Sequence, residues 1–111
     1  MNDSQWTLQD AQAAVDEWIS QWEEGYWPPL SNLARLTEEV GELAREINHT
    51  HGAKPAGDDE GASRIADELG DVLFVVITLA NSLDVDLDEA LQSVLSKYGV
   101  RDAHRFTPKK S

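Results

Sequence analysis

The amino-acid sequence predicts an all-α domain of four helices, and three observations carry this prediction. Apolar residues recur at steps of three and four along most of the chain. The four segments with this spacing are separated by stretches rich in glycine, proline or aspartate, which favour loops. One β-branched run, from Val75 to Thr78, would suit a buried strand, but the sequence offers no second strand to pair with it. We therefore expect one domain over residues 1–111, with a core over about 7–105 and a basic tail over about 102–111.

The first two helices are predicted on either side of a proline-containing loop. The first spans residues 7–22, with Thr7 as a candidate N-cap. Pro28 and Pro29 begin the loop that follows. The second helix is expected from about Ser31 to Asn48, where apolar positions alternate in steps of three and four along one face.

The last two helices differ in polarity. The third is expected over residues 63–82, and its second half is apolar on nearly every side. Such a helix must be covered all round, which predicts contacts between copies of the chain in a homodimer or homotetramer. The fourth helix begins after Asp86, an N-cap candidate with Glu89 three positions on, as in a capping box. It ends between Gly99 and Arg101.

Composition and charge exclude several classes of protein. The 9 Lys and Arg residues against 21 Asp and Glu give a net charge of 9 − 21 = −12, which argues against nucleic-acid and anionic-membrane partners. With 0 Cys, disulfides, zinc–thiolate sites and cysteine nucleophiles are excluded. The longest apolar run, residues 72–80, is far shorter than the about 20 residues that a bilayer requires. No leader segment is visible, so we expect a soluble cytoplasmic protein.

Two acid pairs carry the chemistry that the sequence predicts. Glu39 and Glu42 lie at i and i+3 on the second helix, and Glu68 and Asp71 repeat this spacing on the third. If the two helices pack antiparallel, the four carboxylates converge. Carboxylates gathered in this way repel one another unless a cation lies among them, and oxygen ligands favour Mg²⁺ or Mn²⁺.

A solvated-face interpretation of the same acids stays open at this point, because acid pairs at this spacing are common on exposed helices. Two features favour a site. Gly41 and Gly70 each lie inside a predicted helix, where glycine costs about 1 kcal/mol relative to alanine. A close approach of the two helices, or room for a ligand, would explain both glycines.

These motifs and their flanks resemble the MazG-type nucleoside triphosphate pyrophosphohydrolases of the all-α NTP pyrophosphatase superfamily. The resemblance rests on the two acid pairs and on four segments, residues 36–43, 67–74, 79–83 and 86–90. It covers roughly residues 8–105 and is greatest for the short single-domain members of the family.

The resemblance implies Mg²⁺-dependent cleavage of a nucleoside triphosphate between its α and β phosphates, with Mn²⁺ as a substitute ion. The products would be a nucleoside monophosphate and pyrophosphate, a reaction that clears unwanted nucleotides from the pool. Glu39, Glu42, Glu68 and Asp71 would be the metal ligands. Glu38 would orient or deprotonate the attacking water.

Basic and polar residues are candidates to bind the substrate. Lys97 and Arg101 match basic positions of the family and would clamp the β and γ phosphates, although cations are also favoured at a helix C-terminus by its dipole. Asn81 matches a position near the nucleotide. Lys54, in a predicted loop, would close over the phosphates.

The four tryptophans divide into two pairs. Trp6 and Trp27 lie outside the predicted helices and are candidates to stack on the base, with packing as the alternative role. Trp18 and Trp22 lie on the apolar face of the first helix, so we expect them in the core or in an interface.

Two other functions compete with the enzyme. A non-catalytic helical interaction module that keeps the fold would explain the apolar third helix but not the convergent acids. A di-iron bundle would need two E-x-x-H motifs, whereas only Glu46 and His49 form one.

Overall fold

The computed structural model describes residues 5–52 and 61–110 of the chain. In this part of the chain the structure contains α-helices and no β-strand, which confirms the all-α prediction. The helices are α1 (Leu8–Ser20), α2 (Pro29–His51), α3 (Gly61–Ser82) and α4 (Leu87–Arg101).

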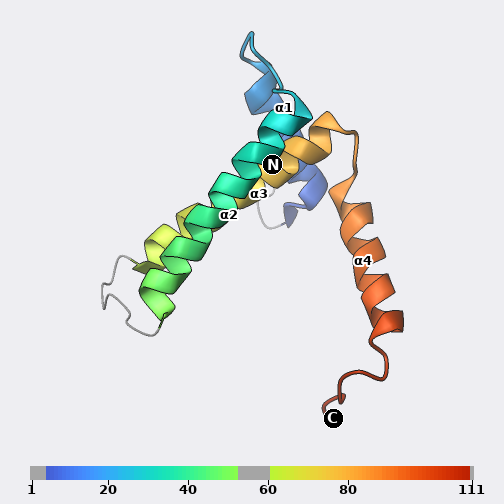
Figure 1. The fold of residues 1–111 in the computed structure, drawn as a ribbon. Coiled ribbons are helices and arrows are strands. Elements are labelled where there is room, and N and C mark those ends of the chain that lie inside the picture. Colours follow the sequence, from blue (N-terminus) through green and yellow to red (C-terminus); the bar gives the residue numbers. More distant parts are fainter. Residues whose placement is uncertain (1–4, 53–60, 111) are drawn as a thin grey trace.

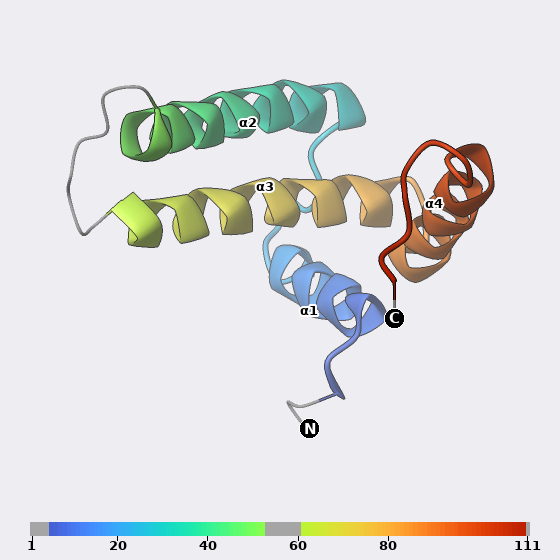
Figure 2. The same cartoon turned by 90° about the horizontal axis from the view of Figure 1, so that it is seen from below.

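The arrangement is an antiparallel pair of long helices with two shorter helices at one end. α2 and α3 lie side by side and form the largest contact of the fold (Figure 2). α1 packs on α3, while α4 has its main contact with α1 and points away from the α2–α3 pair (Figure 1). Within one chain, the four helices therefore do not close into a compact bundle.

Hydrogen bonds at the ends of α1 explain where it begins and ends. The Thr7 hydroxyl accepts from the amide of Asp10, whose carboxylate accepts in return from the Thr7 amide, so the predicted cap is confirmed. The prediction that the helix reaches Trp22 is wrong. The Trp22 amide bonds to the carbonyl of Ile19, a tighter turn, and Gly25 follows at a φ of 59°.

α2 is longer than predicted at both ends. It begins at Pro29 instead of Ser31, because proline has no amide to leave unpaired in a first turn. It ends at His51, three residues beyond the predicted Asn48. α3 likewise begins two residues early, at Gly61.

The turn between α3 and α4 is a Schellman motif. The amide of Val85 bonds to the carbonyl of Ala80 at 2.8 Å, and the amide of Asp84 bonds to that of Asn81 at 3.3 Å. Asp84 takes the left-handed conformation, with a φ of 57°. Asp86 then caps α4 as predicted, since its carboxylate accepts from the amides of residues 88 and 89.

The small core lies where α1 and α2 meet the second half of α3. Val75, Ile77 and Ala80 are buried there, together with Ala11 and Ile19 of α1. The second half of α3 is therefore largely covered within the chain, although Leu73 is 49% exposed.

Large apolar side chains are exposed on all of these helices, including Trp18 of α1, Leu33 of α2, and Leu69 and Leu73 of α3. α4 alone exposes four large side chains: Leu91, Leu95, Tyr98 and Val100. The radius of gyration is 17.5 Å, against about 13 Å for a compact domain of this size. The chain is therefore less compact than an average domain of its length, and many of its large apolar side chains are exposed. None of the helices described here has both the length and the apolarity that a membrane span requires.

Candidate nucleotide and metal site

The antiparallel packing of α2 and α3 brings the predicted acids together. One carboxylate oxygen each of Glu39, Glu42 and Glu68 lies within 4.8 Å of the other two. Asp71, one turn after Glu68 on α3, is close enough for its charge to act on both Glu39 and Glu68. The convergence expected from the two i, i+3 pairs is therefore present within a single chain.

Negative charge dominates the cluster. Burial raises the pKa of Glu39, and the charges of Asp71 and Glu42 raise it further, while the charge of Arg35 offsets part of this increase. Burial likewise raises the pKa of Glu68, with Glu42, Asp71 and Glu39 adding to the effect. The Oε2 atoms of Glu39 and Glu68 are both buried without a hydrogen-bond partner among the described residues. An all-oxygen donor set with two unsatisfied buried oxygens fits a hard divalent cation.

The two glycines beside the acids do not mark a close helix approach. A Cβ atom added at Gly41 or at Gly70 would meet no heavy atom of another part of the chain within 4 Å. Of the two explanations offered by the sequence, close packing within the chain is therefore wrong, and open space beside the acids is what the structure shows.

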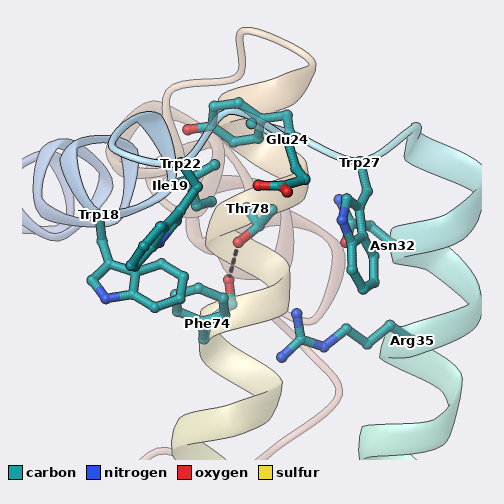
Figure 3. A pocket seen from close by; sticks show the side chains of 11 residues that line it. Trp18, Ile19, Trp22, Glu24, Trp27, Asn32, Arg35, Phe74 and Thr78 are labelled. Carbon is teal, nitrogen blue, oxygen red and sulfur yellow. Dashed lines mark hydrogen bonds between the residues drawn. The ribbon is translucent and has the colours of Figure 1, made fainter.

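A second feature, an aromatic pocket, lies where the α1–α2 loop meets α2 and α3. Its volume is about 300 Å³. The rings of Trp18, Trp22, Trp27 and Phe74 surround it, and Arg35 lies at its edge nearest the acids along α2 (Figure 3). Trp18 meets Trp22 and Phe74 edge to face, with ring centroids 6.0 and 5.8 Å apart.

Known proteins resemble the chain in both sequence and structure. Residues 28–106 match the MazG nucleotide pyrophosphohydrolase domain. The uncharacterized protein YpjD of Bacillus subtilis (strain 168) is 52% identical over 103 residues, which cover 93% of this chain and 93% of YpjD. The crystal structure of YPJD from Bacillus subtilis has a TM-score of 0.75 and 53% identity, covering 83% of this chain and 94% of that one.

A second crystal structure, of the Bacillus-conserved MazG protein, a nucleotide pyrophosphohydrolase, gives a TM-score of 0.73 at 46% identity. It covers 94% of both chains. The chain belongs to the MazG nucleotide pyrophosphohydrolase family. As a member of the MazG family it is a hydrolase that acts on nucleotides, and the acid cluster lies within the matched residues.

The remaining catalytic and basic candidates lie at varying distances from the cluster. Glu38 is exposed on α2, next in sequence to Glu39 but not among the three convergent carboxylates. Lys97 and Arg101 lie on α4, which has its main contact with α1 and points away from the α2–α3 pair that carries the acids (Figure 1). Arg101 is instead paired with Asp102 at 3.1 Å. Lys54 lies outside the described residues.

The polar and aromatic candidates are placed as follows. Asn81 exchanges two hydrogen bonds with Gln12 of α1, which occupy both ends of its amide. Trp27 lines the aromatic pocket, whereas Trp6 lies outside it. Trp18 and Trp22, expected in the core or in an interface, are about half exposed in this chain and also line the pocket.

Sequence reasoning missed Arg35 and Asn32, which both line the aromatic pocket. A signal for Arg35 was present, because it is the cation one turn before the first acid pair. No sequence signal marked Asn32, whose burial depends on how the α1–α2 loop folds. The structure does not favour the di-iron alternative, because Glu46 of the E-x-x-H motif forms an ion pair of 2.9 Å with Arg64 and His49 is exposed.

Proposed function

We propose that the protein is a metal-dependent nucleoside triphosphate pyrophosphohydrolase. It cleaves ribo- or deoxyribonucleoside triphosphates between the α and β phosphates, and releases a nucleoside monophosphate and pyrophosphate. One observation carries the proposal, the approach of three glutamate oxygens within 4.8 Å at a site with two unsatisfied buried oxygens. A cluster of this charge binds a polyphosphate only with cations between them.

Glu39, Glu42, Glu68 and Asp71 would hold the metal, for which Mg²⁺ is our first choice and Mn²⁺ a substitute. A divalent ion held there would neutralise charge on the phosphates and would make a water molecule more acidic and so a better nucleophile. The reaction also requires that the triphosphate is held with its leaving pyrophosphate in line with the attacking oxygen, for which Lys97 and Arg101 are our candidates.

Glu38 is our candidate to orient the attacking water and accept its proton. It is exposed and adjacent in sequence to a proposed ligand, so it is free to hydrogen-bond to a water at the edge of the cluster. A carboxylate hydrogen-bonded to the attacking water can act as its general base.

We propose further that a second copy of the chain completes the site. The triphosphate needs cations beyond the metal, and the candidates Lys97 and Arg101 lie on α4, which points away from the α2–α3 pair of its own chain (Figure 1). They lie on α4, whose exposed apolar face suits burial against another copy. Docking of α4 on a partner would bring positive charge towards the negative cluster of that partner. Removal of unwanted nucleotides is the role that this activity would serve.

A product assay tests the proposed function. The wild-type protein is incubated with a panel of ribo- and deoxyribonucleoside triphosphates, with Mg²⁺, with Mn²⁺ and with a chelator. Monophosphate and pyrophosphate should form only with metal, and Glu39→Gln and Glu68→Gln should each lower kcat at least a hundredfold. Glu17→Gln, on the exposed surface of α1, is the matched control and should keep full activity.

Two outcomes would contradict the proposal. Release of inorganic phosphate in place of pyrophosphate would show that a different bond is cleaved. A folded wild-type protein that binds Mg²⁺ but leaves every triphosphate intact would favour the non-catalytic module that keeps the fold.

A further inference from the structure

The aromatic pocket has the shape and lining of a site for a planar ligand. Three tryptophans and Phe74 surround a volume of about 300 Å³, and their rings stand at different angles around it (Figure 3). Aromatic faces bind the π-face of any nucleobase by stacking, without regard to its hydrogen-bonding edge. Selection among bases must therefore come from the polar groups of the pocket.

The first polar group is an unsatisfied donor. Asn32 is 2% exposed, and its Nδ2 has no hydrogen-bond partner among the described residues. Buried amide groups are nearly always hydrogen-bonded, because a donor removed from water without a partner destabilises the fold. A ligand atom that accepts a hydrogen bond would satisfy it.

The second polar group is the guanidinium of Arg35. It lies 6.0 Å from the ring centroid of Trp27 and 5.6 Å from that of Phe74. Its charge acts on Glu39, where it lowers the pKa, but among the described residues its guanidinium makes no hydrogen bond and no ion pair within 4.0 Å, so its planar fork of donors remains available. Arg35 lies one turn before Glu39 on α2, which makes the pocket and the acid cluster neighbours along the same helix.

Acceptors are also present in the lining. The hydroxyl of Thr78 donates to the carbonyl of Phe74 at 2.8 Å, so its oxygen can only accept from a ligand. The carboxylate of Glu24 lies at the exposed side of the pocket. The pocket thus contains two donors, Asn32 and Arg35, for the acceptor atoms on one edge of a base. It also contains two acceptors, Thr78 and Glu24, for the N–H groups on another edge.

This pattern complements one class of base. We propose that the pocket binds the nucleobase and that Arg35 and Asn32 select a 6-oxopurine, which is guanine or hypoxanthine, over adenine. This proposal rests on the proposed pyrophosphohydrolase activity. The O6 and N7 atoms of a 6-oxopurine are adjacent acceptors that match an arginine fork. Adenine has the same size and stacks equally well, but presents an amino donor in place of O6.

Two measurements on the wild-type protein test the selection. The first compares kcat/KM for dGTP, dITP and dATP with Mg²⁺, and we expect both oxopurines to exceed dATP by on the order of tenfold to a hundredfold. The second titrates dGMP and dAMP, which are not hydrolysed, against the tryptophan fluorescence. We expect dGMP to bind more tightly by a similar factor. Equal values for the purines, or a pyrimidine nucleotide as the best substrate, would overturn the proposal.

Variants separate base reading from a structural role. Arg35→Met keeps the aliphatic stem and should remove most of the preference for dGTP over dATP, while Arg45→Met, a matched change on the exposed part of α2, should not. Arg35→Lys keeps the charge near Glu39 but loses the fork, so it should also lose the preference. A ratio of dGTP to dATP that is unchanged in Arg35→Met would refute the assignment.

Asn32→Leu gives an independent check, because it removes an unsatisfied donor and keeps the branched shape and the number of heavy atoms of the side chain. We expect its Tm to equal or exceed that of the wild type while the preference for dGTP falls. A lower Tm with unchanged preference would assign Asn32 to the fold alone and contradict its role as a reader.

The two proposals fail in different ways. Selective binding of dGMP by a protein that hydrolyses no triphosphate would retain the base pocket and refute the proposed function. Hydrolysis of all the purine nucleotides at equal rates would retain the proposed function and refute the base selection.

Discussion

At the scale of single residues, repulsion among the carboxylates of the acid cluster destabilises the metal-free protein. Glu39 and Glu68 have raised pKa values because burial and neighbouring carboxylates disfavour their charged forms. The folded state therefore binds protons more tightly than the unfolded chain above the ordinary glutamate pKa of 4.5. The metal-free protein should gain stability as the pH falls towards that value, and lose it as the pH rises.

A metal titration tests whether a cation relieves the repulsion among these carboxylates. At pH 7.5, Mg²⁺ should raise the Tm, with a linkage contribution of about 2.7 kcal/mol at a concentration 100 times Kd. Glu39→Gln should have a higher Tm than the wild type in chelator, because one repelling charge is gone, and should respond weakly to Mg²⁺. Differential scanning fluorimetry with and without chelator measures both. A variant that is less stable than the wild type in chelator would contradict the account of the repulsion.

Tyr26 provides a second prediction at this scale. Its hydroxyl donates to Asp16 at 2.6 Å, and burial together with this carboxylate raises its pKa from 10.0 to about 12. The stability that this bond contributes, about 1 kcal/mol, is present below pH 10 and lost as the pH rises towards 12. Comparing the phenolate absorbance of the wild type and Tyr26→Phe isolates this titration. A component near pH 10 that disappears in the variant would show that the bond is absent in solution.

The residue scale also shows what sequence alone can predict of a site. The four acids were predictable because i, i+3 spacing and antiparallel packing together determine where they meet. For Arg35 the signal was its place one turn before the first acid pair, and this place alone does not distinguish it from a solvated arginine on a charged helix. The burial of Asn32 results from contacts that only the folded α1–α2 loop creates.

At the scale of elements, periodicity identified all four helices, whereas their ends depended on local hydrogen bonds. Thr7 and Asp86 were found because side-chain caps have a sequence signature. The end of α1 before Trp22 was missed, because a turn stabilised by backbone groups leaves little trace in the residue types. The end of α3 was predicted although Asp84, and not glycine, occupies its left-handed position.

The left-handed conformation of Asp84 leads to a prediction about the free energy of unfolding. Asp84→Gly should raise the free energy of unfolding by up to about 1 kcal/mol, since the left-handed region costs glycine less than other residues. Asp84→Val, the matched opposite change, should lower it, because a β-branched side chain is strained at positive φ. Urea denaturation of the three proteins measures the order. Equal stability of both variants would mean that this conformation is not kept in solution.

At the scale of the whole molecule, docking of α4 on a second copy would account both for the open shape of the chain and for the separation of Lys97 and Arg101 from the acid cluster. A chain with a radius of gyration of 17.5 Å exposes Leu95 at 60% on α4, and carries Lys97 and Arg101 on the same helix. If α4 docks on another copy, Leu95→Glu should release monomers of 12.3 kDa in light scattering and abolish most of the activity. Ser93→Glu, a polar position of α4, should leave the mass unchanged. A wild-type protein that is already monomeric would refute this assembly.

Mixing two inactive variants tests whether the site is shared between copies. Glu68→Gln retains a normal α4, and Arg101→Met retains normal acids, so each is expected to be nearly inactive alone. In a dimer formed from equal amounts of the two, half of the molecules are mixed, and each mixed dimer contains one site with intact acids and an intact α4. Unfolding and refolding them together should therefore restore about a quarter of the wild-type activity. If Arg101 served the acids of its own chain, no intact site would form, and the mixture would stay as inactive as its parts.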